Sequence, residues 1–169
     1  MDSELLPVVD ENGVAVGAAT RGECHGGSML LHPVVHLHLQ DPDGRLYLQL
    51  RPEWKKIQPG RWDTAVGGHV DLGECVADAL RRETSEEIGL EVSDPEFIGS
   101  YLFESEVERE LVYVFRAVAD ADAPRPSDEL AGGRFWTADE IEEALGKGTL
   151  TPNFEGEYRR FRQQLTRRG

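Results

Sequence analysis

Residues 68–90 constrain the fold of this 169-residue chain most. They contain a segment with helical spacing in which three glutamates, Glu83, Glu86 and Glu87, fall within five consecutive residues. Apolar residues recur at helical spacing over residues 76–88, and Gly89 provides a favourable C-cap. At about 100° per residue, Glu83 and Glu87 lie beside the apolar stripe and not on the solvent face. Like charges four residues apart repel by about 0.2–0.5 kcal/mol even when exposed, and partial burial makes this repulsion worse. The helix therefore requires a partner for these charges.

A divalent cation is the simplest partner for these carboxylates. Glu86 adds a third one, three residues after Glu83. Mg²⁺ is a hard ion that binds carboxylate oxygens together with waters and substrate phosphates. Arg82 lies four residues before Glu86, so we expect the two side chains to pair and to fix the orientation of the carboxylate. The pattern therefore favours a divalent cation such as Mg²⁺ beside these carboxylates.

Charge and composition argue against several classes of protein. The chain has 18 basic and 32 acidic residues, and its formal net charge of −14 repels nucleic-acid backbones and anionic lipid. The first residues lack a basic stretch followed by an apolar run, and no segment reaches the roughly 20 apolar residues of a membrane span. Cys24 and Cys75 are too few for a disulfide framework. We expect a cytoplasmic protein with reduced cysteines and without a nucleic-acid or membrane partner; the oligomeric state stays open, a homodimer included.

Strand patterns surround the acidic helix. A hairpin is expected over residues 6–19, because Asn12-Gly13 supplies the positive φ angles that a tight turn needs. A glycine-containing loop and a second hairpin over residues 30–51 follow. Further strands are expected over residues 62–70, interrupted by Gly67 and Gly68, and over residues 97–103 and 110–118, with helices over residues 138–145 and 153–167. Strands with helices packed on their faces predict an α/β fold with a mixed sheet.

Residues 68–90 resemble the signature of the Nudix family. That signature is Gly, five residues, Glu, seven residues, Arg-Glu, an apolar residue, any residue, Glu-Glu, any residue, Gly and an apolar residue. Thr84 stands where an aliphatic residue is usual. The resemblance implies a single Nudix-type domain, an α/β/α sandwich with a mixed β-sheet, divided into an N-terminal hairpin and loop (1–28), a core (29–150) with the Nudix box (68–90), and a C-terminal helix (151–169). The chain meets the fixed positions of the signature with Gly68, Glu74, Arg82, Glu83, Glu86, Glu87 and Gly89.

The same resemblance implies a metal-dependent hydrolase that cuts a diphosphate linkage in a small molecule, such as a nucleoside di- or triphosphate or a nucleoside diphosphate-linked metabolite. Glu83, Glu86 and Glu87 would ligate the ion and take part in catalysis, and Glu74 would support the loop and the helix. The ion would neutralise the diphosphate and lower the pKa of an attacking water. Glu83 is the first candidate for the base that takes the proton of this water, and Glu129 is the second.

Outside the box, the chain is similar to type I isopentenyl diphosphate isomerases, a branch of the same family. The resemblance implies that Arg51 and Lys55 bind the diphosphate, with a solvated basic loop as the open alternative. It also implies a second metal site of His25, His32, His69, Glu108 and Glu110. The matching segments are Val8-Val9-Asp10-Glu11, Arg21 with His25, Leu31-His32, Leu48-Gln49-Leu50-Arg51, Lys55, and Pro59-Gly60-Arg61-Trp62 leading to Gly68-His69.

Gly67 argues against isomerisation. Type I isomerases need a cysteine just before the Gly-His pair and have a degenerate Nudix box, whereas here the box is intact and position 67 is glycine. Cys75 lies beyond Glu74 at the start of the helix, so it does not replace that cysteine. The leading hypothesis is a hydrolase on an isomerase-like scaffold. An isopentenyl diphosphate isomerase-like enzyme is the alternative, and a noncatalytic binding module comes third.

The histidines leave two interpretations open. His32, His36 and His38 share parity on one expected strand and so project from one face, as Glu108 and Glu110 do on another. Imidazole and carboxylate together suit Zn²⁺ or Mn²⁺. The same histidines can instead lie on a hydrated sheet face or bond to loops around a pocket. A similar choice, between nucleobase stacking and core packing, applies to Trp54, Trp62 and Trp136.

Overall fold

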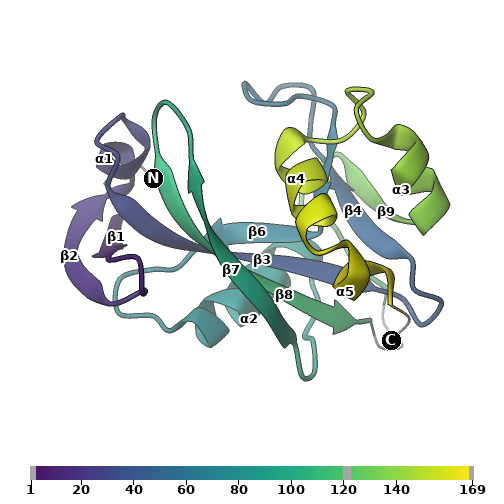
Figure 1. Ribbon diagram of the computed structural model, residues 1–169, viewed down its shortest axis with the longest axis horizontal. Helices are drawn as coiled ribbons and strands as arrows, with labels where there is room; N and C mark the ends of the chain where they lie inside the picture. Colours follow the sequence, from purple (N-terminus) through teal and green to yellow (C-terminus); the bar gives the residue numbers. More distant parts are fainter. Residues whose placement is uncertain (1–2, 120–122, 168–169) are drawn as a thin grey trace.

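The computed structural model describes residues 3–119 and 123–167 and is built on a seven-stranded mixed sheet (Figure 1). In chain order the elements are β1 (Leu5–Val9), β2 (Ala15–Thr20), α1 (Arg21–His25), β3 (Leu31–Gln40), β4 (Leu46–Leu50), β5 (Trp62–Thr64), β6 (Val66–His69), α2 (Val76–Ile88), β7 (Glu96–Glu104), β8 (Arg109–Val118), β9 (Gly132–Trp136), α3 (Ala138–Ala144), α4 (Pro152–Arg160) and α5 (Arg162–Thr166). The sheet follows the order β5-β4-β3-β8-β7, with β6 paired to β3 and β9 paired to β4. β3 and β8 run parallel, and the other pairs of this sheet are antiparallel.

Helices cover both faces of the sheet around β3. Leu37 of β3 and Leu80 of α2 belong to one buried cluster. Val34, on the opposite face of β3, belongs to a second cluster with Phe154 and Tyr158 of α4. Burial on both faces is usual for a strand in a parallel pair, because helices cover the sheet on each side. The structure is therefore the predicted α/β/α sandwich, with α2 and the α4–α5 segment packed on different faces (Figure 1).

The N-terminal hairpin forms as predicted, but the loop that follows contains a short helix. β1 and β2 pair antiparallel, and Gly13 in their turn has φ +84°. α1 begins after Thr20, whose side chain accepts the backbone N–H of Glu23 while the Glu23 carboxylate accepts that of Thr20. This reciprocal pair is a capping box, a local signal that could have predicted the helix. α1 matters for the site because it ends at His25.

Two further expectations were wrong in detail. Residues 62–70 do not form a strand pair interrupted at Gly67 and Gly68: β5 pairs with β4, β6 pairs with β3, and both glycines lie inside β6. The closing helix is divided at Phe161, where φ is −114° and ψ is 23°. The Phe161 ring packs close to Gly99 of β7, so tertiary packing overrides helical propensity there.

The acidic helix forms over the predicted residues 76–88 and ends at Gly89, which is left-handed with φ +64°. Within residues 3–119 and 123–167, no helix is both long and apolar enough to span a membrane. β9 was not among the strands predicted from the sequence.

Candidate functional site

A pocket of about 920 Å³ is lined by residues of α2, β4, β5 and β6. The three carboxylates that the sequence grouped on one helix, Glu83, Glu86 and Glu87, all contribute to its wall. Glu83 and Glu87 are partly buried, whereas Glu86 is exposed. Other lining residues that matter below are His36, Gln49, Arg51, Lys55, Asp63, Gly67, Gly68, His69 and Glu129.

Glu83 and Glu87 lie where α2 approaches β6. A Cβ atom at Gly68 would collide with the Glu83 carboxylate, so glycine permits this close approach. Gln49 donates from Nε2 to Glu87 Oε1 at 3.1 Å. The other oxygen of Glu87, Oε2, is buried, and no donor among the described residues reaches it. Burial and the neighbouring Glu83 raise the pKa of Glu87 to about 9.

These features fit a divalent cation. A buried carboxylate oxygen without a hydrogen-bond donor is costly. A cation beside it supplies the interaction that this oxygen lacks and offsets the repulsion between Glu83 and Glu87. Glu86, with a side chain 59% exposed, offers a further carboxylate oxygen from the solvent side of the helix. Oxygen ligands with room left for water and phosphate match the preference of Mg²⁺.

Arg82 ties the loop of the Nudix box to the helix. Its guanidinium donates to the two oxygens of Glu74 at 2.9 and 3.0 Å and to the His69 carbonyl at 3.0 Å. Hydrogen bonds from Arg82 lower the pKa of Glu74. Glu86, the partner expected from four-residue spacing, is 3.4 Å away, whereas Glu83 forms a shorter ion pair at 2.7 Å. The arginine thus orients the Glu83 carboxylate and fixes the loop with one planar group.

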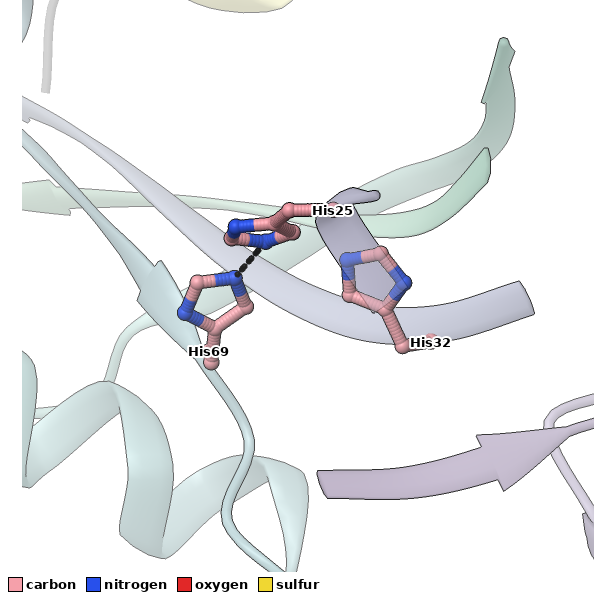
Figure 2. Close-up of side chains that lie close together, drawn as sticks. All are labelled: His25, His32 and His69. Carbon is pink, nitrogen blue, oxygen red and sulfur yellow. Dashed lines mark hydrogen bonds between the residues drawn. The ribbon is translucent and has the colours of Figure 1, made fainter. Parts of the chain in front are cut away.

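Three histidines converge from α1, β3 and β6 (Figure 2). The Nε2 atoms of His25 and His69 are 3.0 Å apart. One potential ligand atom from each of the three rings lies within 4.8 Å of the others. His32 Nδ1 is bonded to the Leu30 carbonyl at 3.1 Å, and its Nε2 is buried without a hydrogen-bond partner in the described part of the chain.

Two carboxylates form an overlapping group with the same histidine. Ligand atoms of His32, Glu108 and Glu110 also lie within 4.8 Å of one another, so the five residues predicted for a second metal site form two groups that share His32. Burial and Glu108 raise the pKa of Glu110 to about 8. Burial and nearby positive groups lower the pKa of His69 to about 3. Imidazole and carboxylate groups this close together are a donor set that fits a bound transition-metal ion.

Arg51 and Lys55 both line the pocket, as a phosphate-binding role requires. The Arg51 guanidinium donates to a loop carbonyl at 2.8 and 3.1 Å and lies 3.8 Å from Asp63. Lys55 Nζ lies 4.9 Å from the centre of the exposed Trp54 ring. Glu129, the second candidate base, is exposed on the pocket rim.

The tryptophans do not form a stacking platform in this pocket. Trp136 is buried, and Trp62 meets it edge to face with ring centres 5.4 Å apart, so both belong to the core. Trp54 is 68% exposed, which the core interpretation did not anticipate. Within the described residues, none of the three lines the pocket.

Sequence reasoning missed the partner of two histidines. His36 and His38 share a face with His32 as predicted, but both bond to Glu157 of α4, at 2.8 and 2.7 Å. A signal was present: Glu157 lies three residues after Phe154, on the helix face that the apolar residues bury. An acidic residue on such a face requires partners, although the sequence does not identify them.

The sandwich and its acidic helix above a pocket define a protein of the Nudix type, and comparisons with known proteins agree. The NUDIX domain family matches residues 30–154. An uncharacterised Nudix hydrolase of Streptomyces coelicolor is 36% identical over 163 residues, 94% of this chain and 88% of that protein. An isopentenyl-diphosphate Delta-isomerase of Kocuria rhizophila is 33% identical over 141 residues, 80% of this chain and 78% of that protein. A crystal structure of a Deinococcus radiodurans protein has a TM-score of 0.75 and 25% identity, covering 93% of this chain and 98% of its own.

The chain belongs to the Nudix family. Hydrolases of this family act on diphosphate bonds of small molecules and generally use divalent ions such as Mg²⁺. The relatives include proteins named as isomerases as well as hydrolases, which agrees with both resemblances found in the sequence.

Proposed function

We infer that this protein is a Mg²⁺- or Mn²⁺-dependent hydrolase that cleaves a diphosphate linkage in a nucleoside di- or triphosphate or a nucleoside diphosphate-linked metabolite. The observation that supports this most is the Glu83–Glu87 pair beside a pocket of about 920 Å³, because Glu87 Oε2 is buried and has no hydrogen-bond partner within the described residues. A protein that only bound its ligand would not require clustered, partly buried carboxylates at this cost.

Different residues of the pocket bind the ion and the substrate. Glu83, Glu86 and Glu87 hold the cation, which neutralises diphosphate charge and makes water a better nucleophile. Arg51 and Lys55, which line the same pocket, bind phosphate oxygens. Glu83 is the first candidate base because it lies in the metal cluster, and Glu129 on the rim is the second.

A second ion site belongs to the same proposal. It is formed by His25, His32, His69, Glu108 and Glu110. An ion there is supported by His32 Nε2, which is buried and has no hydrogen-bond partner in the part of the chain that the structure describes. Imidazole and carboxylate ligands favour Zn²⁺ or Mn²⁺.

Release of phosphate from nucleotides, nucleotide sugars, coenzyme A and dinucleotides tests the proposal. We expect turnover of one of these classes only with Mg²⁺ or Mn²⁺, and we expect Glu83→Gln to lower it by at least about 100-fold. Asp78→Asn is the matched control, because it removes a carboxylate from the same helix whose side chain is 61% exposed. Near wild-type turnover by Glu83→Gln on the substrate found would show that the metal assignment is wrong.

An isopentenyl diphosphate isomerase-like activity is the second candidate. The assembled histidine and glutamate groups and the isomerase-named relatives favour it. Gly67 opposes it, because position 67 offers no thiol for proton transfer.

A further inference from the structure

A buried carboxylate lies beside the pocket and has no part in either ion site. Glu157 of α4 is 1% exposed. Its Oε2 accepts hydrogen bonds from His36 Nδ1 at 2.8 Å and from the Tyr101 hydroxyl at 2.5 Å, and its Oε1 accepts one from His38 Nε2 at 2.7 Å. Three donors on one carboxylate keep it ionised in the interior. Such an anion requires a positive charge close by.

His36 supplies that charge. Burial alone would lower its pKa, but the charge and hydrogen bond of Glu157 outweigh burial and raise the pKa of His36 to about 9. Glu110 and Asp63, which also face the imidazole, act in the same direction. Since Nδ1–H is committed to Glu157, Nε2–H remains as a second donor.

The free edge of the His36 ring faces the pocket. His36 lines the pocket together with Gly67 and Gly68. A Cβ atom built at Gly67 would lie 3.3 Å from His36 Cδ2 and 3.6 Å from Nε2, so the absence of a side chain at Gly67 leaves this edge accessible. Gly68, the next residue, faces Glu83 in the same way. Two adjacent glycines of β6 therefore open the pocket toward the carboxylates on one side and toward the imidazole on the other.

We propose that His36 is a substrate-binding residue whose Nε2–H donates to a phosphate oxygen of the bound diphosphate, and that Glu157 is the positioning residue that holds the imidazole in place. This inference rests on the proposed function, because it assumes a diphosphate in this pocket. Acidic groups dominate the nearby wall, and the Arg82 guanidinium is occupied by Glu74 and Glu83. A preformed imidazolium gives an anionic substrate a charge-assisted hydrogen bond on the side of β6 away from the helix carboxylates.

Binding of methylenediphosphonate, a diphosphate analogue that is not hydrolysed, tests the proposal in the presence of Mg²⁺. We expect His36→Gln to raise the Kd of this probe by at least about 10-fold, because a neutral amide replaces the positively charged donor to the phosphate. Tyr158→Phe is the control: it removes a buried hydroxyl from the residue of α4 that follows Glu157, and Tyr158 does not line the pocket, so the Kd should stay at the wild-type value. In wild-type protein labelled with ¹⁵N-histidine, the probe should shift the Nε2 resonance of His36 and leave that of His38 in place.

The outcomes separate this inference from the proposed function. Probe binding through His36 in a protein that hydrolyses none of the substrates tested would support the binding role and refute the hydrolase. Hydrolysis together with an unchanged His36 resonance, or an equal Kd for His36→Gln and wild type, would overturn the role of His36 alone. Failure of the wild type to bind the probe would overturn it as well. The resonance measurement on wild type decides the question even if His36→Gln does not fold.

Discussion

In the metal-free protein, Glu87→Gln should increase stability even though it removes a residue assigned to the active site. Burial and Glu83 raise the pKa of Glu87 from 4.5 to about 9. The unfolded chain loses this proton above pH 4.5 and the folded chain retains it, so each pH unit between the two values costs about 1.4 kcal/mol of folding free energy. The cost is absent below pH 4.5, is about 3 kcal/mol at pH 7, and stops growing above pH 9.

Glutamine suits this position in the absence of metal. Its carbonyl oxygen can still accept from Gln49 Nε2, and its amide can donate to the Glu83 carboxylate, so packing is kept while the charge is removed. Thermal unfolding in EDTA from pH 5 to pH 8 is the assay. At pH 7 a gain of about 3 kcal/mol raises the Tm of a chain of this size by about 6–12 °C, whereas at pH 5 the gain falls below about 1 kcal/mol.

Glu86→Gln is the matched control for this experiment. It removes the same charge from the same helix, but Glu86 is exposed, so we expect a change within about 0.5 kcal/mol at every pH. With saturating Mg²⁺ the order should reverse, because wild type gains stability from the ion and Glu87→Gln binds it more weakly. If Glu87→Gln is no more stable than wild type at pH 7, or if its gain does not grow with pH, the buried repulsion that motivates the metal site does not exist.

Two further predictions concern the isomerase-like features. Wild-type protein should not interconvert isopentenyl and dimethylallyl diphosphates, because position 67 has no thiol; an isotope-exchange assay measures this, and exchange at an enzymatic rate would contradict the hydrolase assignment. Protein incubated with Zn²⁺ or Mn²⁺ should retain the ion on elemental analysis, and a His32→Ala/His69→Ala double variant should not, because two of the imidazole ligands are lost. Wild type that retains no ion would eliminate the second site.

Local patterns predicted the parts of this protein whose structure depends on nearby residues. The acidic helix was predicted over the residues it occupies, because amphipathic spacing and the Gly89 cap are both local signals. The failures involve contacts that local patterns do not encode. The last helix is interrupted at Phe161, whose ring packs near Gly99 of β7. β9 forms as a strand because it pairs with β4.

The histidines show how far parity alone can predict a site. His32, His36 and His38 project from one face of β3, as expected, but they serve two different clusters. At about 3.3 Å per residue, His32 and His36 lie about 13 Å apart along the strand, too far to share one ion. The second cluster also depends on Glu157, 121 residues beyond His36, which only the folded chain brings to β3.

Gly67→Cys tests whether the missing thiol is all that separates this protein from its isomerase-named relatives. The φ angle of Gly67 lies outside the left-handed region, so a side chain there is compatible with folding. Its Cβ would lie 3.3 Å from His36 Cδ2, which forces the imidazole to shift by a few tenths of an ångström. We therefore expect the variant to bind methylenediphosphonate several-fold more weakly and to show no isomerase exchange, and Gly67→Ala, which adds the same Cβ without sulfur, to bind it equally weakly. Exchange that appears in Gly67→Cys and not in Gly67→Ala would show instead that the scaffold retains the rest of the isomerase machinery.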